Sequence, residues 1–205
     1  MESLSEEVTW AMPEYDERTA LVVVDIQNDF ADPNGSLYVP EGEQVVAVAN
    51  REIERALAAG SVVTYTQDWH PESTPHFQKD GGIWPVHCVQ GTWGAEFRPD
   101  LRVAGEVVRK GSGGEDGYSG FSVRDPRSGE RGATELGRIL QERGVERIVI
   151  TGLATDYCVK ETAIDGIGLG YDVRIFAEGV RAVNLRPEDG ERALDEAVAA
   201  GATLE

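Results

Sequence analysis

Short apolar runs alternate with segments of helical periodicity, and this alternation constrains the fold more than any other feature of the sequence. Residues 20–24 and 147–150 are nearly all apolar, as in strands that are buried on both faces of a parallel sheet. Further strands are predicted at residues 62–66, 106–109, 172–176 and 202–204, and helices at 43–59, 133–143, 157–169 and 187–200. The pattern therefore predicts an α/β fold with a parallel sheet covered by helices on both faces.

Composition limits the size of the protein and its partners. The 205 residues, 40% of them hydrophobic, suit one domain, which we place at residues 19–205 after a polar N-terminal arm at 1–18. The formal net charge of -18 repels phosphate backbones and anionic membrane surfaces, so neither nucleic acid nor a membrane is an expected partner. No apolar run approaches the roughly 20 residues that span a bilayer.

The N-terminal residues are acidic and lack the apolar core of a signal peptide. We therefore expect a cytoplasmic protein in which Cys88 and Cys158 are reduced thiols. Cys88 is interpreted as a packing residue, with metal ligation as the alternative. We keep a homo-oligomer as an alternative to a monomer.

Four reactive side chains lie at or just after the ends of predicted strands. They are Asp25, Asp68, Lys110 and Cys158. Because the carboxyl ends of parallel strands share one edge of a sheet, these residues are expected to converge there. Taken singly, Asp25 would be a strand-ending cap and Lys110 a solvated charge.

Cys158 follows a strand and a tight turn, at the predicted start of a helix. Unpaired backbone N–H groups and the helix dipole favour an anion at such a position, so a stabilised thiolate is expected. A carboxylate can take the thiol proton and return it to an amine leaving group, while a lysine stabilises negative charge. This combination indicates a cysteine hydrolase.

All three histidines, His70, His76 and His87, fall in the irregular stretch at residues 67–100, close to Asp68. A lone loop histidine is usually a surface hydrogen-bonding group, but three near one aspartate indicate a metal site. Nitrogen-rich ligation with one carboxylate suits Zn, Fe(II) or Mn.

Several sequence blocks, taken together, resemble the nicotinamidases, also called pyrazinamidases, of the isochorismatase-like cysteine hydrolases. The blocks are VVVDIQNDF (22–30), TQDWHP (66–71), WPVHCVQGTWGAEF (84–97), RKG to YSGF (109–121) and GLATDYCVKETA (152–163). The resemblance implies a three-layer α/β/α sandwich around a six-stranded, mostly parallel sheet. It also implies Asp25, Lys110 and Cys158 as the catalytic triad.

The resemblance further implies a cis peptide between Leu153 and Ala154. The backbone N–H groups of Ala154 and Cys158 would form the oxyanion hole, where donors aimed at developing charge lower the barrier.

The family's metal ligands match Asp68, His70 and His87, and the position of His76 holds a fourth ligand in some members. One divalent ion is therefore expected, with zinc as the first choice and Fe or Mn as alternatives.

Aromatic residues at Phe30 and Trp84 match positions that sandwich the substrate ring in the family, and ordinary core packing is the alternative for both. Tyr118 and Tyr157 complete the expected substrate-binding set. Tyr157 stands where relatives often have His, and GSGGEDG (111–117) is one residue longer than in the bacterial pyrazinamidases. These departures concern substrate breadth and loop position.

By resemblance, the expected reaction converts nicotinamide to nicotinate and ammonia, and pyrazinamide to pyrazinoate, through a cysteine thioester in NAD salvage. One alternative is another hydrolase of the superfamily that acts on an N-carbamoyl compound, a ureido compound or isochorismate. A second is a metal-binding structural or regulatory domain without catalysis.

Overall fold

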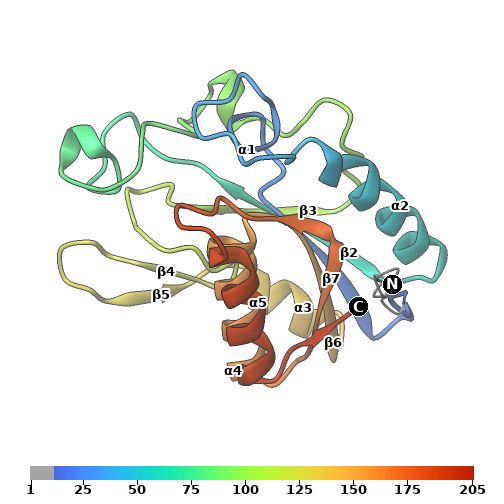
Figure 1. The fold of residues 1–205 in the computed structure, drawn as a ribbon. Helices are drawn as coiled ribbons and strands as arrows, with labels where there is room; N and C mark the ends of the chain where they lie inside the picture. The colour runs from blue at the N-terminus through green and yellow to red at the C-terminus, as the bar shows by residue number, and fades with distance from the viewer. Residues whose placement is uncertain (1–11) are drawn as a thin grey trace, which may run out of the picture.

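The computed structural model describes residues 12–205, in which a β-sheet lies between two layers of helices (Figure 1). The elements follow one another in the order β1 (Thr19–Val24), α1 (Asn28–Ala31), α2 (Gln44–Ala58), β2 (Val62–Asp68), the 3-10 turns Gln78–Asp80 and Trp93–Ala95, β3 (Glu106–Lys110), β4 (Ser122–Arg124), β5 (Arg131–Ala133), α3 (Leu136–Glu142), β6 (Arg147–Leu153), the π turn Thr155–Val159, α4 (Lys160–Gly168), β7 (Asp172–Arg181), α5 (Asp189–Ala200) and β8 (Thr203–Leu204). Residues 1–11 of the predicted N-terminal arm lie outside the described residues.

Six strands form the main sheet in the order β3-β2-β1-β6-β7-β8, and every neighbouring pair is parallel. The predicted six-stranded α/β/α architecture is confirmed. From the central strand β1 the chain builds one half of the sheet through β2 and β3 and the other half through β6, β7 and β8. In sheets wound in both directions, ligands bind beyond the carboxyl ends of the strands at the point of reversal, which here lies beyond β1.

Side chains on β1 alternate between two separate cores. Leu21 and Val23 pack with α2, whereas Ala20, Val22 and Val24 pack with α3 and α4 on the opposite face. All five are fully buried. Figure 1 shows α2 on one side of the sheet and α3, α4 and α5 on the other. The near-continuous apolar run of β1 therefore follows from a strand with no solvent-exposed face.

Gly152 allows β6 to lie close against β1 at the carboxyl edge of the sheet. Its φ is +122°, and a Cβ built on it would lie 2.0 Å from the carbonyl oxygen of Val24. Any larger residue would force the two strands apart, since the clash is with backbone. The glycine thus keeps the ends of two site-bearing strands together.

The sequence-based boundaries differ from the structure in the segment that follows β3. The helix predicted at residues 133–143 begins only at Leu136, because residues 131–133 form β5 and pair with β4 in a small antiparallel hairpin. This hairpin projects from the body of the molecule (Figure 1). The strand predicted at residues 172–176 continues to Arg181, with a register irregularity opposite β6.

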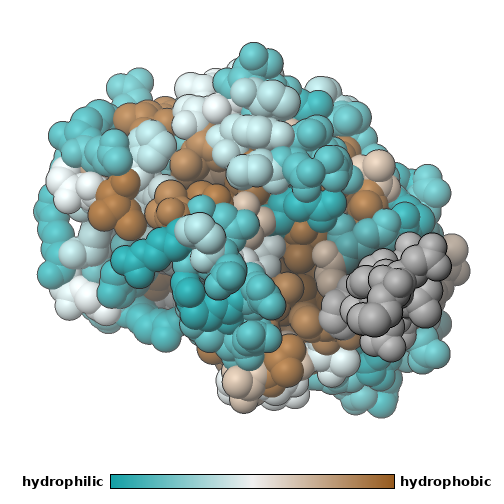
Figure 2. All heavy atoms as spheres, in the orientation of Figure 1, coloured by the Kyte–Doolittle hydropathy of each residue, from teal (hydrophilic) through white to brown (hydrophobic). Residues whose placement is uncertain are grey.

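Most of the face shown in Figure 2 is hydrophilic, with hydrophobic patches between the polar side chains. Within residues 12–205, no helix has the length and apolar character needed to cross a membrane.

Candidate active site

Lys110 lies at the centre of the predicted catalytic group. Its Nζ is 2.8 Å from Oδ2 of Asp25 and 3.5 Å from Sγ of Cys158. The same nitrogen lies 2.6 Å from Oδ1 of Asp68. The lysine side chain is only 1% exposed, so the solvated-charge interpretation is wrong. The structure thus brings together the four side chains whose convergence was predicted from the strand ends.

Burial and close charges shift the ionisation of these groups in opposite directions. Burial alone would lower the pKa of Lys110, but Asp25 and Asp68 outweigh it and hold that pKa well above its usual value. Burial also opposes ionisation of Asp68, yet Lys110 and the neighbouring histidines hold the pKa of that carboxyl well below its usual value. Asp25 differs, because burial raises its pKa and the attraction of Lys110 offsets this only in part. A carboxyl with a raised pKa is a better proton acceptor.

The expected stabilised thiolate at Cys158 is not supported. Burial raises the pKa of the Cys158 thiol well above its usual value, and the carboxylates of Asp25 and Asp68 raise it further against the pull of Lys110. The cysteine sits inside the π turn Thr155–Val159, before α4 begins at Lys160. This environment favours the protonated thiol, which needs a base before it can act as a nucleophile.

The three histidines form a buried cluster beside this group. One ring nitrogen of each of His70, His76 and His87 lies within 4.8 Å of the other two. The rings of His70 and His76 are stacked, with centroids 4.9 Å apart. Nε2 of His70 is 3.8 Å from Oδ2 of Asp68, which places the histidine cluster next to the predicted triad. Asp68 thus directs one carboxylate oxygen to Lys110 and the other to the histidines.

Each imidazole of the cluster keeps at least one ring nitrogen that can bind a cation. Nδ1 of His87 lies 2.7 Å from the carbonyl oxygen of Pro85, and Nδ1 of His76 lies 2.8 Å from Oδ1 of Asp116. In both residues Nε2 is left as the free ligand atom. Neither buried ring nitrogen of His70 has a hydrogen-bond partner among residues 12–205. Three imidazoles next to one carboxylate fit a divalent transition metal such as zinc.

Ionisation also favours metal binding, since only a neutral imidazole is a ligand. Burial lowers the pKa of His87 to about 4. The hydrogen bond from His76 lowers the pKa of Asp116 to about 2, so this carboxylate is ionised at neutral pH.

A glycine, Gly111, follows Lys110 because the backbone at this position lies close to the His70 ring. Its φ is +74°, and a Cβ there would lie 2.6 Å from Nδ1 of His70. A side chain at this position would displace the imidazole.

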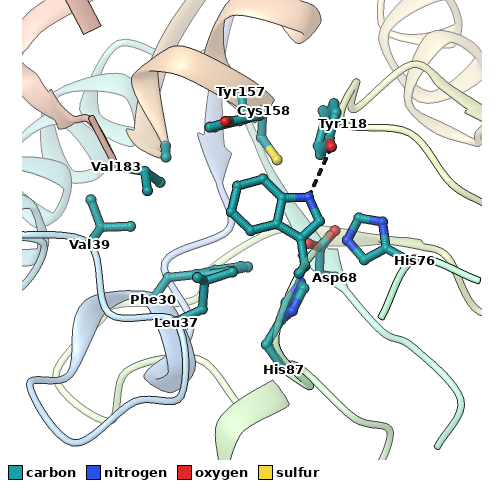
Figure 3. A pocket seen from close by; sticks show the side chains of 12 residues that line it. Phe30, Leu37, Val39, Asp68, His76, His87, Tyr118, Tyr157, Cys158 and Val183 are labelled. Carbon is teal, nitrogen blue, oxygen red and sulfur yellow. Dashed lines mark hydrogen bonds between the residues drawn. The ribbon is translucent and has the colours of Figure 1, made fainter. Parts of the chain in front are cut away.

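A small pocket joins the sulfur to the histidine cluster (Figure 3). In Figure 3, Asp68, His76 and His87 lie on one side, while Val39 and Val183 lie on the other. Its lining consists of Phe30, Leu37, Val39, Asp68, His76, Trp84, His87, Tyr118, Ala154, Tyr157, Cys158 and Val183. All four predicted substrate-contacting aromatics are in this set. The pocket therefore has one polar wall, one apolar wall and the thiol at its boundary.

The aromatic residues of the pocket hold one another in place. Nε1 of Trp84 donates a hydrogen bond of 3.0 Å to Oη of Tyr118, drawn as the dashed line in Figure 3. The Trp84 and Tyr157 rings meet edge to face, with centroids 4.9 Å apart. Burial raises the pKa of Tyr118 to about 12, so this phenol keeps its proton. Trp84 and Phe30 line the pocket and are only 5% and 8% exposed, so both also pack against neighbouring side chains.

The peptide between Leu153 and Ala154 is cis, as the resemblance implied. The carbonyl oxygen of Ala154 accepts hydrogen bonds of 3.1 Å from the N–H groups of Tyr157 and Val159. These bonds tie the end of β6 to the turn that carries Cys158.

Residues 19–205 match the Isochorismatase domain family. The chain belongs to the isochorismatase family. A curated nicotinamidase of Escherichia coli (strain K12) is 39% identical to it over 203 residues, which cover 90% of this chain and 93% of that protein.

Solved structures of this family are similar along nearly the whole chain. A zinc complex of the pyrazinamidase of Pyrococcus horikoshii has a TM-score of 0.81 and 40% identity, covering 92% of this chain and 98% of that one. PnC1 from L. infantum, in complex with nicotinate, has a TM-score of 0.83 and 32% identity, covering 95% and 96%.

Sequence reasoning missed several residues of this isochorismatase-family site. Thr66 donates a 2.7 Å hydrogen bond from Oγ1 to Oδ1 of Asp25. Its position near the carboxyl end of β2 could have indicated that it belongs to the site. Leu37, Val39 and Val183 form the apolar wall but come from two loops whose sequence carries no periodicity. Asp116 lies in the glycine-rich run at residues 111–117, where no sequence pattern links it to His76.

Cys88 is fully buried, and its thiol contacts the carbonyl oxygen of Gly94 at 3.9 Å. The two cysteines are free. Both observations agree with the interpretation of Cys88 as a packing residue.

Proposed function

We propose that this chain is a metal-dependent nicotinamidase that hydrolyses nicotinamide to nicotinate and ammonia, and pyrazinamide to pyrazinoate, within NAD salvage. The proposal rests above all on one observation, that the Cys158 thiol and the imidazoles of His76 and His87 face the same small pocket. A planar amide with a ring nitrogen would offer its carboxamide carbon to the thiol and its ring nitrogen to the imidazole side. The curated nicotinamidase and the nicotinate complex among its relatives support the same substrate class.

The first half of the proposed reaction acylates the cysteine. Asp25 accepts the proton of Cys158, and the sulfur adds to the carboxamide carbon to give a tetrahedral intermediate. The N–H groups of Ala154 and Cys158 stabilise its oxyanion. Asp25 then returns the proton to the amide nitrogen, the C–N bond breaks, and ammonia leaves a thioester behind.

The second half releases the acid. Asp25 takes a proton from water while the oxygen of that water attacks the thioester carbon. The C–S bond breaks, the sulfur regains its proton from Asp25, and the carboxylic acid ionises in solution. Lys110 stays protonated throughout, because its two carboxylate neighbours raise its pKa, and it stabilises the negative charge that develops near the sulfur.

The cluster of Asp68, His70, His76 and His87 is proposed to hold one divalent ion, with zinc as the first choice and Fe or Mn as alternatives. A bound ion would supply a Lewis acid for the ring nitrogen of the substrate, directly or through water, and so fix the carboxamide against Cys158. Phe30, Trp84, Tyr118 and Tyr157 are proposed to enclose the ring.

The test is an ammonia and nicotinate assay on the purified protein with nicotinamide, before and after treatment with a chelator. We expect equal amounts of the two products, loss of turnover on chelation, and recovery with added zinc. Cys158→Ala and Asp25→Asn should each lower kcat by at least about a thousandfold while zinc binding persists. Retention of a tenth of the activity in Cys158→Ala would remove the cysteine from the nucleophile role.

An N-carbamoyl or ureido compound serves as the comparison substrate. If the zinc-loaded protein hydrolysed such a compound and released no ammonia from nicotinamide, the proposed substrate would be wrong. Turnover of neither compound by the zinc-loaded protein would favour a binding domain without catalysis.

A further inference from the structure

His76 differs from the other two histidines of the cluster in the partner of its ring. Its Nδ1 lies 2.8 Å from a carboxylate oxygen of Asp116, 40 residues further along the chain. His87 instead faces the neutral carbonyl oxygen of Pro85 in its own loop. A carboxylate that accepts Nδ1–H fixes the tautomer whose lone pair is on Nε2 and makes that nitrogen a stronger ligand.

Asp116 lies in the loop between β3 and β4, and several hydrogen bonds hold it there. Its backbone N–H donates a 2.7 Å hydrogen bond to the carbonyl oxygen of Arg124, at the end of β4. Its Oδ1 also accepts the N–H of Gly117 at 2.9 Å, and its Oδ2 lies 3.4 Å from Nη2 of Arg124. The carboxylate therefore has a fixed position that does not depend on His76 alone.

The imidazole is confined by these contacts on two sides. The side chain of His76 is 6% exposed and that of Asp116 is 25% exposed, so the pair is largely shielded from solvent. Asp116 contacts the edge of the His76 ring at Nδ1, and one face of that ring stacks on His70. A second contact, a 3.2 Å hydrogen bond from Oγ1 of Thr74 to the carbonyl oxygen of Gly114, joins the same two loops.

We propose that Asp116 is a positioning residue that makes His76 a fourth metal ligand, so that ion affinity depends on a carboxylate that does not touch the ion. The inference rests on the metal site of the proposed function. It adds a connection from β4 through Arg124 and Asp116 to the ion.

Equilibrium zinc affinity, measured by competition with a chromophoric chelator at fixed pH, tests the proposal without turnover. Loss of an outer-sphere partner typically weakens metal binding about 10- to 100-fold, which is the decrease expected for Asp116→Ala. Asp116→Asn, which keeps an acceptor oxygen without the charge, should fall between this variant and the wild type.

Glu115→Ala is the matched control, because the Glu115 carboxylate accepts the N–H of Gly113 at 2.8 Å and forms no hydrogen bond or ion pair with a histidine among residues 12–205. Its zinc affinity should stay within about twofold of the wild type, as expected for a surface substitution. Circular dichroism and thermal unfolding of the zinc-free proteins identify any variant that fails to fold, and Asp116→Asn then serves in place of Asp116→Ala.

A double-variant cycle shows whether Asp116 acts through His76. In a His76→Ala background, Asp116→Ala should cause no further loss of zinc affinity, because the group that it orients is gone. Two losses that add, or an Asp116→Ala variant with wild-type affinity, would overturn the inference, as would a wild-type protein that binds no zinc. A protein that binds zinc through this pair but leaves nicotinamide intact would overturn the proposed function alone.

Discussion

Lys110 places a positive charge where water cannot compensate it, between the carboxylates of Asp25 and Asp68. Such a group is tolerated because its partners lie within hydrogen-bonding distance, and each partner needs the lysine for the same reason. The residue thus has a structural role in addition to its proposed part in the reaction.

Lys110→Met is expected to destabilise the protein as well as inactivate it. Removing one member of a buried charge group leaves the other charges uncompensated, which costs about 3 to 5 kcal/mol in the free energy of unfolding. Urea unfolding of the zinc-free protein measures this loss. Adding Asp25→Asn to the same chain should restore part of the stability, since it removes one uncompensated carboxylate.

Lys79→Met is the matched control for this experiment, because Lys79 pairs with Asp80 at an exposed position. Its effect should stay within about 0.5 kcal/mol. Equal losses for the two lysine variants would show that burial between carboxylates is not what makes Lys110 important to stability.

The sequence could predict residues whose position follows from topology. Asp25, Lys110 and Cys158 were found because strand ends share one edge of a parallel sheet. The raised pKa of Cys158 could not be predicted, because it depends on burial and on carboxylates contributed by other strands. Asp116 was missed for a similar reason, since its partner lies in another loop and the pairing has no sequence period.

At the scale of elements, Asp156 connects the turn that carries the proposed nucleophile, Cys158, to the segment after β7. Its carboxylate accepts the N–H of Val183 at 3.0 Å and that of Asn184 at 2.8 Å. Val183 in turn lines the apolar wall of the pocket. One buried side chain therefore positions this wall relative to Cys158.

Asp156→Ala is expected to loosen that wall without disturbing the ion. Two partly buried N–H groups would lose a charged acceptor, which lowers the free energy of unfolding by about 1 to 3 kcal/mol. The KM for nicotinamide should rise roughly fivefold, as for the loss of about 1 kcal/mol of apolar contact, while zinc affinity is unchanged. Steady-state kinetics and chelator competition measure the two quantities.

Asp195→Ala, an exposed acid on α5, should leave both quantities at the wild-type level. If Asp156→Ala weakened zinc binding as much as it raised KM, its effect would be a general loosening of the site.

Elements whose apolar residues recur at a regular spacing were predicted well, whereas short or irregular elements were not. The helix predicted at residues 43–59 corresponds closely to α2, because its apolar residues recur at helical spacing. The hairpin of β4 and β5 has only three residues in each strand, all of them half-buried or exposed, so it leaves no apolar alternation to detect. The helix predicted at residues 157–169 overlaps only the second half of the π turn Thr155–Val159, because a single π-helical turn has no sequence period that distinguishes it from an α-helix.

At the scale of the whole molecule, the ligands of the proposed ion all lie in residues 68–87, a stretch that takes its irregular shape from packing against the folded domain. Asp68 ends β2, while His76 and His87 lie in the long loop between β2 and β3. In the unfolded chain these groups are separated, so the ion should bind the folded protein in preference to the unfolded one. By mass action, such an ion stabilises the fold.

Zinc is therefore expected to raise the thermal unfolding midpoint of the chelator-treated protein. A free concentration of 100 times Kd adds about 2.7 kcal/mol, which for a chain of this size corresponds to a shift of roughly 5 to 11 °C. Magnesium, which prefers oxygen ligands, should produce no comparable shift. Differential scanning calorimetry at several zinc concentrations measures the effect.

The acidic surface makes a variant control necessary, because a chain with 37 acidic residues offers many weak cation sites. His70→Ala should abolish the zinc-dependent shift, since it removes a central imidazole of the cluster. Asp80→Ala changes an acid in the same loop that bonds to Lys79 and the N–H of Thr74, outside the cluster, so the shift should remain. A shift of equal size in His70→Ala and the wild type would place the stabilising ion on the surface and remove the cluster as its site.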